Sequence, residues 1–208
     1  MTWQTSLAVE SYRAAGEDRA AVFPTPFGCL AVVADGVGGR SGGAAAADAV
    51  IEAVRSLAEA IASPLDLRSW ATWLRQLDQQ MAGEATVGET TAVIAALSAA
   101  GIIGVAVGDS VAWVAIENQC HSLATGSEPK PWLGSGVARP VPFAHLNLAG
   151  TLLLATDGLT KYADRQRIVG LLQSETLERL PKQLIDAVRY GSGRLPDDVG
   201  VIVAKWEA

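Results

Sequence analysis

Acidic residues recur at the ends of apolar segments, in positions where several of them could share one site. Three apolar runs of strand length each end in an aspartate followed by a small residue. Carboxylates adjoin predicted strands at five places: Glu17-Asp18, Asp35, Asp109, Asp157 and Asp197-Asp198. Mg²⁺ and Mn²⁺ prefer oxygen ligands, and two such ions about 3.5–4 Å apart can activate water for attack on phosphorus. The pattern therefore indicates a site for divalent cations.

Each acidic residue also has a simpler explanation when it is taken alone. Asp-Gly is ordinary turn chemistry, Glu17-Asp18 fits a solvated pair, and Asp197-Asp198 fits a cap of the last strand. The simple explanation weakens for the whole set, because so many negative groups in one cleft would repel one another without a cation.

The stretch from Leu30 to Gly43 is the centre of the chain's organisation. An apolar strand stops at Asp35, a glycine-rich turn follows, and an alanine-rich helix begins. Such glycines let the backbone approach a small ligand. A nucleotide-phosphate loop fits less well, because neither Gly-Lys-Ser/Thr nor Gly-x-Gly-x-x-Gly follows the strand. An aspartyl nucleophile of a phosphotransferase would have a second Asp two residues later, where this chain has Val37.

The elements that must position these residues come in blocks. Strands are expected at 3–9, 19–23, 28–34, 90–97, 101–107, 111–117, 120–124, 151–156 and 199–204, and helices at 42–62, 64–81, 165–172 and 181–190. We expect Ser63 to cap the second helix, with Pro64 in its first turn. The four consecutive strands between 90 and 124 are expected to pair as antiparallel neighbours. The Pro- and Gly-rich segment 125–148 is predicted to be a loop. Blocks of this kind exclude a doubly wound parallel sheet.

The composition narrows the class of protein. The chain has 208 residues, 50% of them hydrophobic, and a formal net charge of −6. That length suits one domain or at most two small ones, and the absence of a basic cluster argues against nucleic acid as a partner. No signal peptide is expected at the N-terminus, and the apolar stretch 92–107 is interpreted as a hairpin, not a membrane span. Cys29 and Cys120 are expected to be reduced core thiols, so we expect a cytoplasmic protein without membrane attachment.

The motifs, taken in series, resemble the PPM, or type 2C, family of metal-dependent serine/threonine protein phosphatases. They occur in family order and span nearly the whole chain: Arg13-Ala14-Ala15-Gly16-Glu17-Asp18, Asp35-Gly36-Val37-Gly38-Gly39, Gly88-Glu89-Thr90, Gly108-Asp109-Ser110, Thr156-Asp157-Gly158-Leu159 and Asp197-Asp198-Val199-Gly200-Val201. The resemblance implies an α+β fold, a four-layer α-β-β-α sandwich with two antiparallel sheets flanked by helices. It also implies a single catalytic domain over residues 1–208, with a short flap at 125–148 around Trp132.

The resemblance further implies a reaction and a set of roles. The reaction is hydrolysis of phosphoserine or phosphothreonine by a metal-bridging hydroxide. Two ions of Mn²⁺ or Mg²⁺ are implied, with a third in some bacterial members, and the partner is a phosphoprotein, a Ser/Thr kinase or one of its targets. Asp35 would bridge both metals and the Gly36 carbonyl would face the first. The remaining implied roles are metal ligation by Glu17, Asp157 and Asp197, a third ion at Asp109 with Asp157, and phosphate binding by Arg13.

Several positions depart from the family pattern. Gly16 replaces the usual Asn, Val111 the Arg that often follows Gly-Asp-Ser, and Gly200 the usual Thr or Ser. Val37 stands where some members have a histidine that protonates the leaving group. The two histidines of the chain, His121 and His145, lie outside the motifs. A rival interpretation is a catalytically weak or inactive relative that binds a phosphoprotein without turning it over, but the complete set of carboxylates argues against it.

Overall fold

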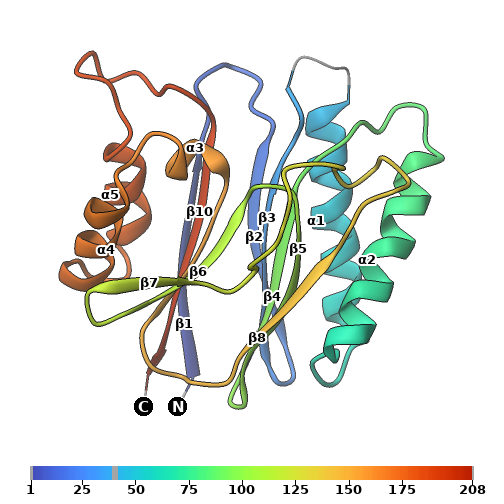
Figure 1. Cartoon of the computed structure of the whole chain (residues 1–208), viewed down its shortest axis with the longest axis horizontal. Helices are drawn as coiled ribbons and strands as arrows, with labels where there is room; N and C mark the ends of the chain where they lie inside the picture. Colours follow the sequence, from blue (N-terminus) through green and yellow to red (C-terminus); the bar gives the residue numbers. More distant parts are fainter. Residues whose placement is uncertain (1, 39–41, 208) are drawn as a thin grey trace.

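Two antiparallel five-stranded sheets lie face to face, with helices on the outer face of each (Figure 1). The computed structural model describes residues 2–38 and 42–207. The first sheet has the order β1 (Thr2–Glu10), β10 (Val199–Glu207), β9 (Thr151–Ala155), β6 (Val111–Ile116) and β7 (Gln119–Ser122). The second has the order β2 (Asp18–Thr25), β3 (Gly28–Asp35), β4 (Ala92–Ser98), β5 (Gly101–Val107) and β8 (Val141–His145). The expected four-layer α+β sandwich is confirmed.

The central strands are apolar without interruption because both of their faces are buried. In β3, Leu30 and Val32 face the helices while Ala31 and Val33 face the other sheet. Strands β4, β9 and β10 alternate in the same way between the core of the sandwich and an outer core. Strands covered on both faces contain few polar residues. This explains why these segments could be predicted as strands from the sequence.

The helices form two outer layers. Helices α1 (Gly43–Ala60) and α2 (Leu67–Ala82) cover the second sheet, and α3 (Asp157–Thr160), α4 (Arg165–Ser174) and α5 (Leu180–Asp186) cover the first. The expected start of α2 was wrong. Its N-cap is Asp66, whose carboxylate accepts a hydrogen bond from the Ser69 N–H at 2.7 Å, so Ser63 and Pro64 precede the helix. A carboxylate at this position satisfies a free N–H group of the first turn.

Two expectations about strands were also wrong. The segment 125–148 is not wholly a loop, because Val141–His145 forms β8 and pairs with β5. The four strands between 92 and 122 do not all pair with their neighbours in sequence, because β5 and β6 belong to different sheets. Gly108 follows β5 and has a φ of 91°, a conformation that favours glycine. The turn that contains Gly108 and Asp109 connects β5 in one sheet to β6 in the other.

The first and last strands place Thr2 and Glu207 side by side at one end of the sandwich. Thr2 pairs with Glu207 at one end, where both termini lie, and Glu10 pairs with Val199 at the other (Figure 1).

Among the described residues, no helix is both long enough and apolar enough to cross a membrane. Cys29 and Cys120 are free and buried, as expected.

Candidate active site

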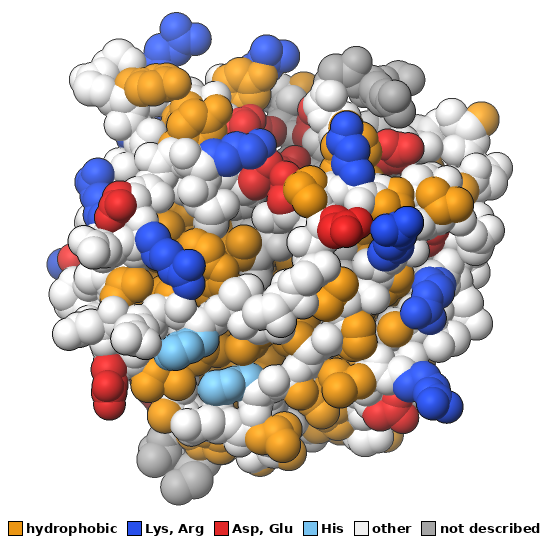
Figure 2. Space-filling view, in the orientation of Figure 1, with side chains coloured by type: hydrophobic (Ala, Val, Ile, Leu, Met, Phe, Trp, Pro, Cys, Tyr) orange, Lys and Arg blue, Asp and Glu red, His pale blue; other side chains and the backbone are white. Residues whose placement is uncertain are grey.

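A cleft of about 270 Å³ opens at the end of the sandwich opposite the termini. It collects the carboxylates of all five places marked in the sequence: Glu17, Asp18, Asp35, Asp109, Asp157, Asp197 and Asp198. Figure 2 shows acidic side chains gathered over this end of the molecule. Strand ends and turns from both sheets supply them, so the cleft exists only because the two sheets meet here.

Asp18 and Asp35 form the buried centre of the cleft. They are cross-strand partners of β2 and β3, and Asp18 accepts a hydrogen bond from the Thr156 hydroxyl at 2.6 Å. Burial raises the pKa of Asp35 to about 9, and the charge of Asp18 raises it in the same direction. Burial also raises the pKa of Asp18 to about 7, against the lowering effect of the Thr156 hydrogen bond. Without a cation, these two groups therefore tend to retain protons.

The opposite wall of the cleft contains Asp109, Asp157 and Asp197. Burial raises the pKa of Asp109, and the charge of Asp157 acts in the same direction. Burial is likewise the largest cause that raises the pKa of Asp197, whose side chain accepts the N–H of Asp198 at 3.0 Å. Asp157 begins α3 and forms an ion pair with Lys161, one turn further along. Three carboxylates and one ammonium group therefore share this wall.

Two threonines fix the backbone of Asp35. The Thr91 N–H donates to the Asp35 carbonyl at 2.8 Å, and the Thr90 hydroxyl donates to the same oxygen at 2.8 Å. The Asp35 N–H donates to the Thr91 hydroxyl at 3.1 Å, and that hydroxyl also shares a hydrogen bond of 2.7 Å with Ser110. Because Ser110 follows Asp109, the Thr91 side chain connects the positions of Asp35 and Asp109.

The glycines after Asp35 let the chain pack closely around Glu17. The Gly36 N–H donates to the Glu17 carbonyl at 3.2 Å. A Cβ atom on Gly36 would come within 2.4 Å of the Gly43 carbonyl oxygen, and one on Gly43 within 2.6 Å of the Glu17 carboxylate. The start of α1 and the Glu17 side chain therefore require glycine at both positions. Gly39, the last residue of this motif, lies outside the described residues.

Asp198 holds the N-terminal loop against the cleft. Its carboxylate accepts hydrogen bonds from the N–H groups of Tyr12 at 2.9 Å and Glu17 at 2.6 Å. Arg13 lies on this loop but does not line the cleft; its guanidinium lies 4.5 Å from the centre of the Tyr12 ring, and Tyr12 does line it. No role at the site was predicted from the sequence for Asp198 or Asp18, although both belong to acidic pairs that stand out in it.

The flap around Trp132 is held by Asp78, for which the sequence predicted no role. Asp78 of α2 is 1% exposed, and its carboxylate accepts the N–H groups of Gly134, Gly136 and Ala138 at 2.7, 3.1 and 3.0 Å. Leu133 also pairs with Thr90 through two backbone hydrogen bonds of 2.9 Å. These bonds place Trp132 on the lining of the cleft. The sequence signal that could have identified Asp78 is an acidic residue on the apolar face of a predicted helix.

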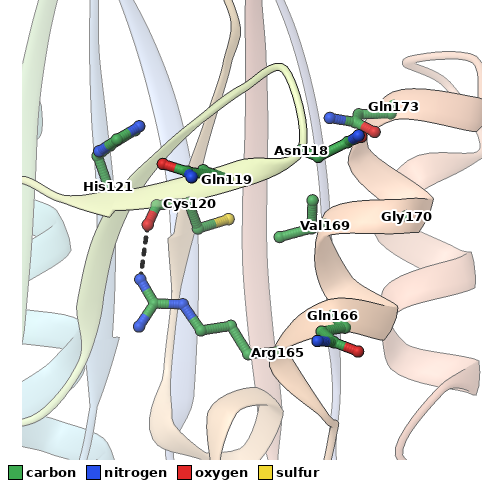
Figure 3. A pocket seen from close by; sticks show the side chains of 9 residues that line it. All are labelled: Asn118, Gln119, Cys120, His121, Arg165, Gln166, Val169, Gly170 and Gln173. Carbon is green, nitrogen blue, oxygen red and sulfur yellow. Dashed lines mark hydrogen bonds between the residues drawn. The ribbon is translucent and has the colours of Figure 1, made fainter.

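A larger cavity of about 520 Å³ lies between the β6–β7 hairpin and α4 (Figure 3). Four of its nine lining residues have amide side chains. The Arg165 guanidinium donates to the Cys120 carbonyl at 2.6 Å and lies over the Trp113 ring. Its described lining residues include Cys120 and His121 but no Asp or Glu. They form no group that could hold a metal ion, so the smaller acidic cleft is the candidate site.

The oxygen atoms that line the cleft are suitable ligands for divalent cations, but their side chains are not positioned to surround one. Among residues 2–38 and 42–207, no three His, Cys, Asp or Glu side chains are grouped so that they could hold a metal ion. Asp157 is engaged by Lys161 and Asp198 by two N–H groups, so part of the carboxylate set is already paired. The abundance of oxygen donors and the raised pKa values fit Mg²⁺ or Mn²⁺, with side-chain rotation needed for ligation.

The fold and the acidic cleft together define a domain of the PPM phosphatase type. The model of the Stage II sporulation protein E family (SpoIIE) matches residues 26–207, and the chain belongs to this family. The resemblance to PPM phosphatases is thereby confirmed. No curated protein matches the chain.

Solved structures of bacterial phosphatases share this fold over nearly their whole length. A bacterial serine phosphatase with one arginine replaced by glutamate is 24% identical, with 100% of both chains covered and a TM-score of 0.86. The serine/threonine phosphatase Stp1 from Staphylococcus aureus is 22% identical, covers 100% of this chain and 96% of its own, and has a TM-score of 0.82. The catalytic domain of the phosphatase PstP, in complex with two manganese ions, is 20% identical, with coverages of 98% and 97% and a TM-score of 0.82.

Proposed function

We propose that the chain is a metal-dependent phosphatase that hydrolyses phosphoserine or phosphothreonine in proteins. The observation that supports this most directly is the convergence of the carboxylates from both sheets in one cleft. Such a cluster is costly in a folded protein unless cations offset its charge. Membership of the SpoIIE family and the shared fold with serine/threonine phosphatases support the same conclusion.

The carboxylates would hold two ions of Mn²⁺ or Mg²⁺. The proposed ligands are Glu17, Asp35, Asp157 and Asp197, with the carbonyl oxygen of Gly36. Bound ions would lower the pKa of a water molecule and offset the charge of the substrate phosphate. The PstP domain with two manganese ions supports this number of ions. Asp18, held by Thr156, would keep Asp35 in position from the neighbouring strand.

Arg13 would bind the substrate phosphate at the mouth of the cleft. Guanidinium offers paired donors in one plane and stays charged, which suits a phosphate group. Its contact with Tyr12, a lining residue, supports this role because it places the positive charge of Arg13 beside the lining of the cleft. Trp132 would contact residues that flank the phosphorylated side chain, since it lines the same opening.

The whole chain, residues 1–208, would act as one catalytic domain with a short flap at 125–148. Its substrate would be a phosphoprotein, which includes a Ser/Thr kinase or a target of one. The solved relatives described as serine/threonine phosphatases support this substrate class.

The test is phosphate release from an aryl phosphate and from a phosphoserine peptide. Purified protein should release phosphate when Mn²⁺ or Mg²⁺ is added, and phosphate release should stop when EDTA is added. The matched control is Asp66→Asn, because Asn caps a helix as well as Asp does and Asp66 is not a lining residue. Activity that persists in EDTA would reject the metal-dependent mechanism. Peptide binding without release under any divalent ion would favour the inactive, phosphoprotein-binding alternative.

A further inference from the structure

Lys161 places a fixed positive charge inside the acidic cleft. It follows the short helix α3, and its N–H donates to the Asp157 carbonyl at 2.8 Å. One helical turn brings its ammonium group into an ion pair with the Asp157 carboxylate. The Lys161 side chain is 53% exposed and that of Asp157 is 12% exposed, so the charge lies at the boundary between the cleft and solvent.

The positive charge of the ammonium group also acts on carboxylates other than that of Asp157. Asp109 and Asp197 are the next negative charges that act on Lys161, after Asp157. Lys161 in turn acts on both of them as a favourable charge. Among the described residues that line the cleft, Lys161 is the sole lysine or arginine. It therefore supplies the only cationic side chain of that lining.

The position of this charge matters for the number of metal ions. Asp109 and Asp157 are the pair for which the family resemblance implies a third divalent ion. An ammonium group has three donors, enough to bond a carboxylate, a second carboxylate and a phosphate oxygen. A divalent cation on the Asp157 oxygen that pairs with Lys161 would lie within a few ångströms of the ammonium charge, and the two would repel strongly. The other Asp157 oxygen would serve the two-metal site.

We propose that Lys161 takes the place of a third metal ion beside Asp109 and Asp157, so that the site binds two divalent ions. This inference rests on the proposed function, because it assumes that the remaining carboxylates bind metal. The ammonium group offsets part of the negative charge of that wall, and it can donate to a phosphate oxygen when substrate is bound.

The test counts bound ions. Free Mn²⁺ measured by electron paramagnetic resonance during a titration gives the number of ions per chain. Wild type should bind two, and Lys161→Met, which removes the charge but keeps a chain of similar length, should bind three. Lys161→Arg should bind two, because it restores the charge. The matched control is Lys182→Met on α5, since Lys182 also pairs with an aspartate four residues away but lies outside the cleft, and it should bind two.

Thermal unfolding in EDTA gives a second measurement that needs no metal. Lys161→Met should lower the melting temperature by at least about 2 °C relative to Lys182→Met, because carboxylates lose their nearest counter-charge. Lys161→Gln serves the same comparison if Lys161→Met does not fold. Three ions on the wild type, or equal numbers on wild type and Lys161→Met, would overturn the inference and leave the proposed function standing. No Mn²⁺ bound by any variant would overturn both.

Discussion

Asp18 and Asp35 are direct partners across the β2–β3 ladder, with the first residue of one strand opposite the last residue of the next. The two carboxylates therefore approach each other by the geometry of an antiparallel pair, before any tertiary contact is considered. Like charges placed opposite each other destabilise a sheet, so the doubly ionised form of this pair is unfavourable in the metal-free protein, in line with the raised pKa of both groups. Its presence is consistent with a role that only a bound cation makes favourable.

Replacing Asp35 with asparagine should abolish phosphate release while the protein stays folded. The substitution keeps the size of the side chain and removes the carboxylate that a metal ion would need. In EDTA, we expect the melting temperature of Asp35→Asn to equal or exceed that of wild type, because asparagine has no ionised form for burial and the Asp18 charge to disfavour. A melting temperature several degrees lower would instead assign a structural role to Asp35. Asp66→Asn should match wild type in both measurements.

Replacing Thr91 with valine should weaken both the fold and the site. Thr91 is 3% exposed, and its hydroxyl accepts the Asp35 N–H and bonds Ser110. Valine keeps the shape but leaves both groups without a partner, which should cost about 1–3 kcal/mol in the free energy of unfolding. Urea unfolding measures this cost, and kcat/KM should fall as well. Thr72→Val, at an exposed position of α2, should change neither quantity.

Replacing Asp78 with alanine should release the flap. Three backbone N–H groups would lose a charged acceptor, so the free energy of unfolding should fall by at least about 2 kcal/mol. Because the affected loop carries Trp132, the KM for a phosphopeptide should rise more than the KM for a small aryl phosphate. Gln76→Ala, on the exposed face of the same helix, is the control. Equal changes for both substrates would argue against contact between Trp132 and the peptide.

Replacing Arg13 with alanine should separate substrate binding from metal binding. The KM for a phosphopeptide should rise and kcat/KM should fall, because a guanidinium group stabilises phosphate charge throughout the reaction. Calorimetric titration with Mn²⁺ should give nearly the wild-type affinity, since arginine does not ligate a cation. Arg68→Ala on α2 is the control for loss of a positive charge. An unchanged kcat/KM would leave Arg13 as a surface residue.

Cys29 should resist alkylation in the folded protein. Burial raises the pKa of its thiol to about 11, against about 8.5 for an ordinary thiol. The thiolate is therefore disfavoured in the folded state, and the free energy of unfolding should fall as the pH rises from about 9 towards 11. At pH 9, iodoacetamide should label Cys29 slowly in native protein and rapidly in urea, as measured by mass spectrometry. Rapid labelling of the native protein would show that the thiol is accessible.

The strands of the core were predictable because burial on both faces leaves a continuous apolar signal. Strand β8 was not, because Pro140 and Pro142 are local loop signals and its pairing with β5 is a long-range contact. The separation of β5 and β6 into different sheets was also hidden. A short connection favours a hairpin between β5 and β6. The positive φ of Gly108 and the packing of the two sheets direct the chain into the other sheet instead.

The acidic positions of the cleft were predictable from their place at strand ends, but their partners were not. Asp78 looked like one more polar residue of an amphipathic helix, although it lies one turn after Leu74 on the buried face. Lys161 gave no signal in the sequence, because its importance depends on Asp109 and Asp197, which are distant in sequence. Local patterns identify which residues are unusual, and the tertiary structure decides what each one contacts.

The location of both chain ends away from the cleft makes the domain suitable for modular use. Thr2 and Glu207 are neighbours across the β1–β10 ladder, and the adjoining Trp3 and Trp206 rings pack edge to face with their centres 5.6 Å apart. An affinity tag, a fluorescent reporter or a surface-immobilisation linker joined at either end would leave the cleft mouth open. The same geometry would let the domain be inserted into a surface loop of a host protein, because its two ends are separated by only one strand spacing.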